Sequence, residues 1–505
     1  MERNRRSAKT FQHIPAPLTD ADLTSEGDSS TLQVEPGGST VSAHIPHSLV
    51  PDAIAWALDF FFLSYCVFED KDATTSVFRL LPGMYAASEW SSPLCLATRA
   101  LAVNVTGLWS LRSSDITEAR RLYSQAVTRV KIAVANPLES QSDELLLATQ
   151  VLEAYETINT EYQRPSSASV SRGLHASGSM ALLKHRAALN NQSKLARHIA
   201  LAVRRRWIQD AITVRQCMEE TQDIVWWQDD DGPLPLDPAA AVDNLAFKLF
   251  QLRRLWRLSA SGATSLMNFP VPAVDRNPCG RSMLSHAVSL HEECTRWVDV
   301  LPDRWYPTSV HRQDVDESVK AAGMHGTTCH VYSNLSVAST WNWYRIIEFG
   351  VLQLLLHMRL GTRASSNTSG AQVAEMVSRM QAIVDGICAS VPYCTGDITD
   401  PSSPLLGGTI RFPHVHILPS PSAVDPSPTT LPESISQHEQ QLASSGAMLM
   451  HRTLTTIVGM AEDQDTRCHG LQTLHPGQVE WIKSQISRLY RALHPITGGP
   501  AVTFP

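Results

Sequence analysis

Four consecutive residues whose side chains could bind a metal or exchange a proton stand in the segment SLHEECTRW: His291, Glu292, Glu293 and Cys294. A helical zinc site of the metalloprotease type needs two histidines one helical turn apart, with a glutamate between them. The second histidine is missing here. The segment is therefore better interpreted as a polar helix face than as a metal centre.

Two further groups are similarly incomplete. His414 and His416 flank Val415, and on a strand they could share a metal ion, but no third ligand is near in the sequence. We interpret them as loop histidines. The arginines of RRRW at 204–207 could contact nucleic acid. At helical spacing they point in different directions, so salt bridges and a solvated helix face are favoured.

Motifs for phosphate binding and nucleophilic catalysis do not occur in a usable form. Gly407–Gly408 predicts only a turn. The segment GLHASGSM has the letters of a nucleophile elbow at the wrong offsets, and we expect its small residues to permit close helix packing. Asp229–Asp231 are interpreted as an acidic loop. The sequence thus assigns no catalytic, cofactor-binding or metal-binding residue, and it leaves any DNA-binding residue unknown.

The composition limits the class of protein. A chain of 505 residues with 43% hydrophobic residues can bury a substantial core. The net charge of -7 argues against a protein that coats nucleic acid over its whole surface. The nine scattered cysteines argue against a disulfide framework and for a reducing compartment. No signal peptide is visible, and the most apolar stretch, 53–68, is too short for a membrane span.

The elements that would position any site are predicted to be helices. The clearest is 140–160, where Ser140 and Asp143 have the spacing of an N-terminal cap and negative charge lies in the first turn. Its apolar residues recur every three or four positions and predict one buried face. They are Leu145, Ala148, Leu152 and Tyr155.

The same periodicity predicts helices along most of the chain, and strand patterns are nearly absent. The first of these helices is expected to bury Trp56, Phe60, Leu63 and Val67. The predicted helices are 53–68, 93–111, 114–135, 175–188, 195–219, 237–258, 282–301, 325–360, 371–391, 432–462 and 476–493. We therefore expect an all-α fold, an irregular stack of antiparallel helix pairs.

The domain organisation follows from shifts in composition. Residues 1–50 are rich in Ser, Thr, Pro, Gly and acidic residues and are predicted to be a disordered arm. Its basic cluster, Arg3, Arg5, Arg6 and Lys9, is interpreted as a solvated terminus rather than a nuclear-import or phosphate-contacting tail. A helical domain is expected over 51–495, interrupted by a Pro/Ser-rich loop at 404–432 and followed by a tail, 496–505.

Five segments, taken in order along the chain, resemble the regulatory (middle-homology) region of fungal zinc-cluster transcription factors. They are LDFFFLSYCVFED, then SPLCLATRALAVNVTGL with ARRLYSQAVTRVKIAV, LLLATQVLEAYE, LHASGSMALLKHR and VYSNLSVASTWNWYRI. The fourth and fifth segments contain the most specific residues, which are His175, Gly178, Leu182 and Leu183, and Trp341, Asn342, Tyr344 and Arg345. The resemblance implies a helical regulatory and interaction surface without catalytic residues.

One part of the family pattern is missing. Members usually have an N-terminal cluster of six cysteines, beginning C-x2-C-x6-C, that binds two zinc ions and contacts DNA. This chain has no cysteine before Cys66 and no C-x2-C, whereas such a site needs closely arrayed thiolates. We therefore expect no cofactor in this chain, and zinc only if an upstream cysteine cluster exists. DNA contact is then indirect or through that missing segment.

The resemblance implies a nuclear transcriptional regulator of the zinc-cluster type, with secondary-metabolite gene clusters among the pathways that such proteins control. Its implied partners are a second copy or a related regulator, in a homodimer or heterodimer, and transcriptional co-factors; no membrane partner is expected. One alternative is a helical interaction protein without DNA binding that modulates other regulators through protein partners. A second alternative is an enzyme of unidentified chemistry.

Overall fold

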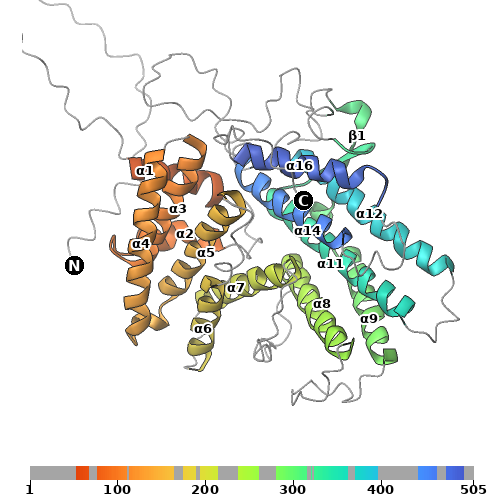
Figure 1. The fold of residues 1–505 in the computed structure, drawn as a ribbon, viewed down its shortest axis with the longest axis horizontal. Coiled ribbons are helices and arrows are strands. Elements are labelled where there is room, and N and C mark those ends of the chain that lie inside the picture. Colours follow the sequence, from red (N-terminus) through yellow and green to blue (C-terminus); the bar gives the residue numbers. More distant parts are fainter. Residues whose placement is uncertain are drawn as a thin grey trace, which may run out of the picture. The chain divides into compact units, whose positions relative to one another are not determined.

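The computed structural model describes residues 53–66, 77–110, 113–163, 174–188, 194–213, 237–260, 280–315, 320, 324–361, 370–395, 442–462 and 474–493. Within these residues, thirteen α-helices and two short strands confirm the all-α class (Figure 1). The chain divides after Ala53, and the core lies in the second unit, Ile54–Pro505. The predicted arm, the Pro/Ser-rich loop and the tail lie outside the described residues.

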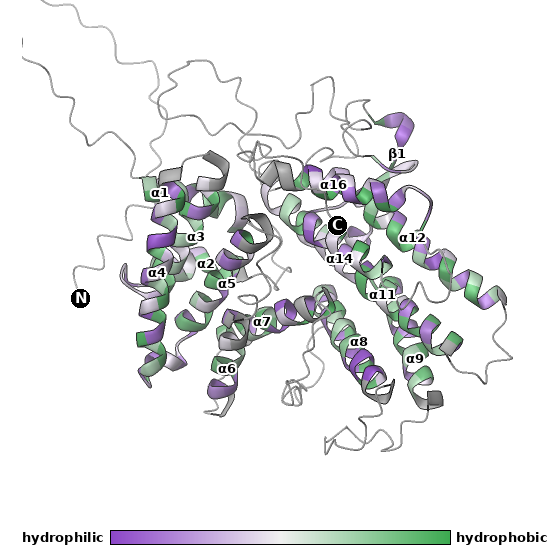
Figure 2. Cartoon of the chain, viewed as in Figure 1, coloured by the Kyte–Doolittle hydropathy of each residue, from purple (hydrophilic) through white to green (hydrophobic). Residues whose placement is uncertain are grey.

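Each of the first seven helices contacts the next one along the chain. Helix α3 packs against α4 and α5, and α5 also contacts α6 and α7. Figure 2 shows hydrophilic and hydrophobic residues alternating along α4, as one-sided burial requires. The helices are α1 (Ala53–Phe61), α2 (Val77–Ala87), α3 (Pro93–Ser110), α4 (Ser113–Ala135), α5 (Asp143–Gln163), α6 (Leu174–Ala188) and α7 (Lys194–Thr213).

The remaining helices surround one central helix. Helix α11 contacts α8, α9, α12 and α14 (Figure 1), and residues 341–356 of α11 are all buried. A continuous buried helix of this kind needs apolar residues on every side. The helices are α8 (Pro238–Ala260), α9 (Gly280–Asp299), α11 (Leu335–Gly361), α12 (Gly370–Cys394), α14 (Ala447–Ala461) and α16 (Gln478–Leu493).

A short hairpin precedes α11, where the sequence predicts helix from residue 325. Strands β1 (Thr308–His311) and β2 (Thr328–Val331) pair in antiparallel register, with Thr308 opposite Val331. The predicted helix 325–360 is therefore wrong over its first ten residues. The β-branched residues of the segment TCHV favour a strand, but four residues are too few for alternation to be recognised.

The N-terminus of α5 differs in one detail from its prediction. The helix begins at Asp143 rather than at Ser140, which lies in the 3-10 turn Glu139–Gln141. The cap is Ser142, whose Oγ accepts a hydrogen bond from the backbone N–H of Leu145 at 3.1 Å. The predicted apolar face of α5 is confirmed as buried. Because Ser140 and Ser142 both precede the helix, only the backbone geometry decides which one caps it.

The predicted buried face of the first helix is wrong at Leu63, whose side chain is 46% exposed. Helix α1 continues into a π-helical turn, Phe62–Cys66. A π turn holds more residues than an α turn and rotates the following side chains. Phe61 and Tyr65 are buried instead and stack with ring centroids 5.5 Å apart. Val67 lies outside the described residues.

The small residues of α6 differ in how closely they pack against neighbouring helices. A Cβ added at Gly178 would meet nothing within 4 Å, so the expected close packing is wrong at this position. Ser179 is fully buried, and its Oγ lies 2.8 Å from both Thr149 Oγ1 and Gln150 Nε2 of α5. The contact between α5 and α6 is thus polar at its centre.

A close backbone approach fixes the start of α14. Gly446 ends the π turn Leu442–Gly446 with a helical φ of -65°. A Cβ added there would lie 2.0 Å from the carbonyl oxygen of Cys394 at the end of α12. The absence of a side chain therefore lets the two segments touch.

Replacing this glycine is expected to destabilise the protein, because Cys394 would have to move. We expect Gly446→Ala to lower the free energy of unfolding by about 1–3 kcal/mol, measured by urea denaturation followed by circular dichroism. Gly459→Ala is the matched control within α14, where an added Cβ meets nothing within 4 Å. The control should raise stability by about 0.5–1 kcal/mol, since glycine is unfavourable inside a helix. Equal effects of the two changes would contradict the close approach.

Candidate functional site

A cavity of about 250 Å³ lies among α5, α7, α11 and α14, and residues of α1, α2 and α8 and of the turns at Tyr65, Trp305 and Ser445 also line it. One part of the wall is aromatic and is formed by Phe61, Tyr65, Phe78, Trp305 and Trp343. The other part carries charged and polar side chains. A concave, mostly apolar site with a few converging polar groups is the usual form of a small-molecule site.

Each helix contributes one face to the cavity, because its lining residues recur every three or four positions. On α5 they are Gln150, Glu153, Ala154, Thr157 and Ile158. On α7 they are Ala202, Arg205, Arg206 and Gln209. On α11 they include Ser336, Ser339, Thr340 and Trp343, and on α14 they include Met448, Arg452, Thr453 and Thr456.

An ion pair ties α7 to α5 at the cavity wall. The Nε atom of Arg206 lies 3.2 Å from Oε1 of Glu153, and its Nη2 donates to Oγ1 of Thr157 at 2.9 Å. The side chain of Glu153 is 10% exposed and that of Arg206 is 28% exposed. Taking two charges out of water is costly unless they are paired and hydrogen bonded, and both conditions are met here.

A second polar contact joins α7, α8 and α11. The indole Nε1 of Trp343 donates to Oδ1 of Asp243 at 3.1 Å, and Nε of Arg205 lies 3.5 Å from the same oxygen. Burial raises the pKa of the Asp243 carboxyl, although the nearby Arg205 guanidinium acts in the opposite direction. Trp343 is therefore held in one orientation at the cavity wall.

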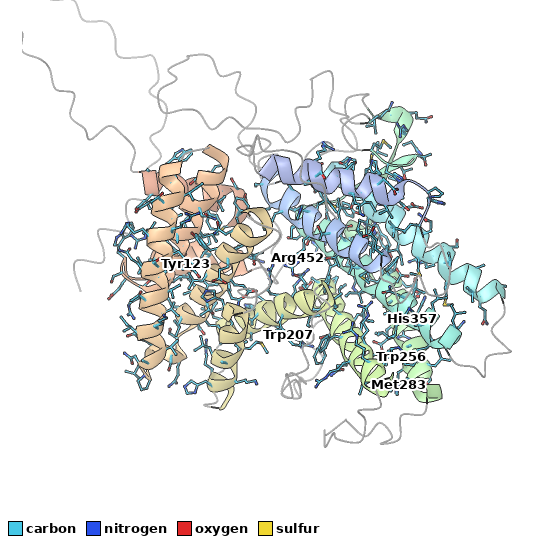
Figure 3. All side chains as sticks on the ribbon, in the orientation of Figure 1. Tyr123, Trp207, Trp256, Met283, His357 and Arg452 are labelled. Atoms are coloured by element: carbon cyan, nitrogen blue, oxygen red, sulfur yellow. The ribbon has the colours of Figure 1, made fainter. Side chains whose placement is uncertain are left out.

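Arg452 brings a third guanidinium group to the cavity, from α14 (Figure 3). The described side chains that line the cavity include three guanidinium groups, those of Arg205, Arg206 and Arg452, and one carboxylate, that of Glu153. Two of the guanidinium groups have a carboxylate within ion-pair distance, Arg206 with Glu153 and Arg205 with Asp243.

The opposite face of α11 holds a buried polar cluster. Arg345 donates from Nη1 to Tyr332 Oη at 2.8 Å and to Asn342 Oδ1 at 2.9 Å. Its Nη2 lies 3.2 Å from Nδ1 of His330, and its guanidinium carbon lies 5.4 Å from the ring centroid of Trp341. The fifth segment of the family resemblance is therefore a structural centre of the helical body.

The structure places the residues considered from the sequence as follows. Glu293 pairs with Lys248, as a polar helix face predicts, but Cys294 is fully buried and its carbonyl oxygen accepts a hydrogen bond from Tyr344. His291 is partly buried on the same helix. His414, His416, Asp229–Asp231, Gly407–Gly408 and the basic cluster of residues 3–9 lie outside the described residues.

Arg205 and Arg206 form the expected salt bridges, with Asp243 and Glu153, but the arginines at 204–206 do not form a solvated face. Arg204 is 6% exposed and lies over the ring of Phe247, 4.6 Å from its centroid. The following Trp207 is also buried and packs edge-on against Phe250 of α8 (Figure 3). The prediction of solvation is wrong because α8 covers this side of α7.

The described cysteines do not fit a zinc cluster. No three His, Cys, Asp or Glu side chains within the described residues lie close enough to hold a metal ion. Burial raises the pKa of the thiols of Cys388 and Cys394 to about 12, so they are protonated at neutral pH. These residues act as apolar core side chains rather than as thiolate ligands.

No family model matches the sequence, and neither a curated protein nor a solved structure matches it. The resemblance to the zinc-cluster family therefore stays a prediction. Within the described part of the chain, no helix has both the length and the apolar character needed to cross a bilayer.

Sequence reasoning missed the residues of the cavity. Glu153, Thr157 and Gln209 lie on faces that also carry buried apolar residues, and helix α2, which supplies Phe78, is absent from the predicted helices. The sequence pattern that could have indicated these residues is a set of polar residues at helical spacing on an otherwise apolar helix face. This pattern identifies a cavity only when the helices that pack against that face are known.

The cluster around Arg345 predicts a pH dependence. Burial first, and then the charge of Arg345, lower the pKa of His330 from 6.5 to about 4. A base whose pKa is lower in the folded state takes up a proton preferentially when unfolded. The contribution of the neutral His330 ring to the free energy of unfolding is therefore fully present above pH 6.5 and is lost as the pH falls towards 4.

We expect wild-type protein to lose about 2 kcal/mol more unfolding free energy than His330→Gln between pH 7 and pH 5. The measurement is urea denaturation at both pH values. His311→Gln, at an exposed position in the same hairpin, is the matched control and should behave like wild type. Identical pH dependence of wild type and His330→Gln would contradict a lowered pKa of His330 in the folded protein.

Proposed function

We propose that this protein is a transcriptional regulator of the fungal zinc-cluster type, which acts through its helical body and binds an effector in the central cavity. The observation that carries the proposal is where the family-like segments lie. Three of the five contribute to the cavity wall: the first through Phe61 and Tyr65, the third through Glu153, and the fifth through Trp343. Segments that resemble a regulatory region thus converge on the candidate site.

The geometry also suggests how a ligand could act. The cavity is bounded by helices far apart in the chain, and polar contacts join them: Arg206 with Glu153 between α7 and α5, and Trp343 with Asp243 between α11 and α8. A ligand shifts a conformational equilibrium only if it binds one state better than the other. Contacts across several helices offer such a difference, because a small displacement of one helix changes them all.

In this proposal the regulator acts in the nucleus, and DNA is contacted either by a segment outside the described residues or by a partner protein. Promoter regulation, nuclear localisation and control of a gene cluster, with secondary metabolism as one class, all belong to this proposal. Dimerisation with a second copy or a related regulator, and recruitment of transcriptional co-factors, belong to it as well.

The test is to delete the gene in its own host and to compare transcripts, together with microscopy of a tagged full chain. We expect nuclear accumulation and altered transcript levels of a defined gene set, restored by the wild-type gene. A second assay fuses the full chain to a heterologous DNA-binding domain and measures a reporter gene. Unchanged transcripts, exclusion from the nucleus and an inert fusion would together contradict the proposal. Co-purification with a DNA-binding regulator despite an inert fusion would favour the interaction-protein alternative.

A further inference from the structure

A groove runs along α11 between α9 and α12, both of which contact α11 (Figure 1). On α11 it extends from Tyr344 to Arg359, which is roughly 22 Å at 1.5 Å per residue. Its length therefore matches about four turns of a further helix. Amphipathic helices of partner proteins commonly bind in grooves of this kind. We call it the α11 groove.

The floor of the α11 groove is apolar and nearly closed to water. Leu352 and Leu355 of α11 and Met376 of α12 line it, and all three are buried. Val288 and Val298 of α9, which are only partly buried, add apolar surface to one wall. The backbone of a partner therefore stays outside the groove, and only its side chains enter. The choice of partner then depends on the rim.

The rim of the α11 groove carries free carboxylates. Glu292 and Asp299 of α9 and Glu375 of α12 line the groove at exposed positions. Within the described structure, none of these three side chains makes a hydrogen bond or an ion pair. Glu348 on the floor differs from them, because Arg379 binds both of its oxygens, at 2.7 and 2.9 Å. That pair is neutral and satisfied.

The remaining cations of the lining do not cancel the charge of the rim. Nη1 of Arg359 donates to Oε1 of the neutral Gln372 at 3.1 Å. One guanidinium group thus stands against three free carboxylates, once Arg379 is counted with Glu348. Even a protonated His291, which also lines the groove, would leave the formal sum negative. The groove favours a partner with basic side chains.

The spacing of the acidic residues favours a helical partner. Glu292 and Asp299 are seven residues apart on α9, so they lie on one face of that helix, two turns or roughly 10 Å apart. Basic residues at positions i and i+7 of a partner helix have the same spacing. Glu375, on α12, faces the other flank of such a helix. The matching partner has an apolar stripe with basic residues on both sides.

We infer that the α11 groove is the docking surface for a basic amphipathic helix of a partner protein. Apolar side chains of that helix enter the groove above Leu352 and Leu355, and its Lys or Arg side chains pair with Glu292, Asp299 and Glu375. As the contact with a transcriptional co-factor, this surface deepens the proposed function and rests on it; the binding of the helix itself does not.

The first experiment measures the binding of fluorescent peptides to purified full chain by anisotropy. The probe is a peptide of about fourteen residues, made of Leu, Ala and Lys, with its leucines on one helical face. One comparison peptide has Glu in place of every Lys, and another has the same composition with its leucines scattered around the helix. We expect the probe to bind at least tenfold more tightly than either, and less tightly as salt is raised.

Two results of this experiment would overturn the inference. Equal binding of the basic and acidic peptides, or no binding of the basic one, would show that the rim does not select positive charge. Equal binding of the peptide with scattered leucines would show general attraction to an acidic protein rather than docking in a groove.

The second experiment locates the surface. Glu375→Lys should weaken the probe at least fivefold, whereas Glu480→Lys, at an exposed position on α16, changes the net charge equally and should have little effect. Ala382→Trp fills the groove from α12 and should also weaken the probe. Ala374→Trp, at an exposed position of α12 outside the groove lining, is its matched control. Unaltered binding in Glu375→Lys and Ala382→Trp would overturn the assignment.

The outcomes separate this inference from its alternatives and from the proposed function. If sedimentation shows that Glu375→Lys converts a dimer into monomers, a second copy occupies the groove and the inference is wrong. If the reporter fusion regulates transcription but the probe does not bind, the regulator stands and the docking surface fails. If the probe binds as expected but transcripts do not respond to the gene, the surface stands and the proposed function fails. Circular dichroism shows whether each variant folds, and the peptide series on wild type is decisive even where a variant does not.

Discussion

The described helical body depends on one buried charge. A guanidinium group inside a protein must find hydrogen-bond acceptors there, because burying an unsatisfied charge is very costly. Arg345 meets this need with the hydroxyl of Tyr332, the amide oxygen of Asn342 and the imidazole nitrogen of His330. These partners come from α11 itself and from the residues around β2, so the hydrogen bonds fix the rotation of the central helix against the hairpin.

The same charge explains features of the neighbouring helix. A Cβ added at Gly386 of α12 would lie 2.9 Å from Nε of Arg345, so α12 approaches without a side chain at this point. With the rotation of α11 fixed on this side, Trp343 must point to the opposite side, where it donates to Asp243 and lines the cavity. The position of the candidate site is thus a consequence of how the buried charge is satisfied.

The sequence predicts the helices well and the site poorly, for physical reasons that differ. A helix such as α5 is encoded locally, because its buried face repeats along one short segment. The choice of Ser142 over Ser140 as the cap, and the π turn after Phe61, depend on backbone geometry that side-chain spacing does not report. The cavity, by contrast, depends on contacts between helices that are far apart in the chain. Arg206 points towards Glu153, which is 53 residues away in the chain, and only the packing of α7 against α5 brings them together.

The polar residues on the inward faces of α5 and α7 also bear on the function of the helical body. Replacing a buried ion pair by well-packed apolar residues is often neutral or stabilising, so Arg206 and Glu153 are not needed merely to hold α7 against α5. Leucines at such positions would close the cavity and make the contact insensitive to any ligand. An ion pair instead links the contact to what occupies the cavity, because a ligand that displaced Glu153 from Arg206 would leave a nearly buried carboxylate unpaired, and the ligand's own contacts would have to offset that cost. Ligand binding and the position of α7 against α5 are then coupled, and regulation by a bound ligand needs such coupling.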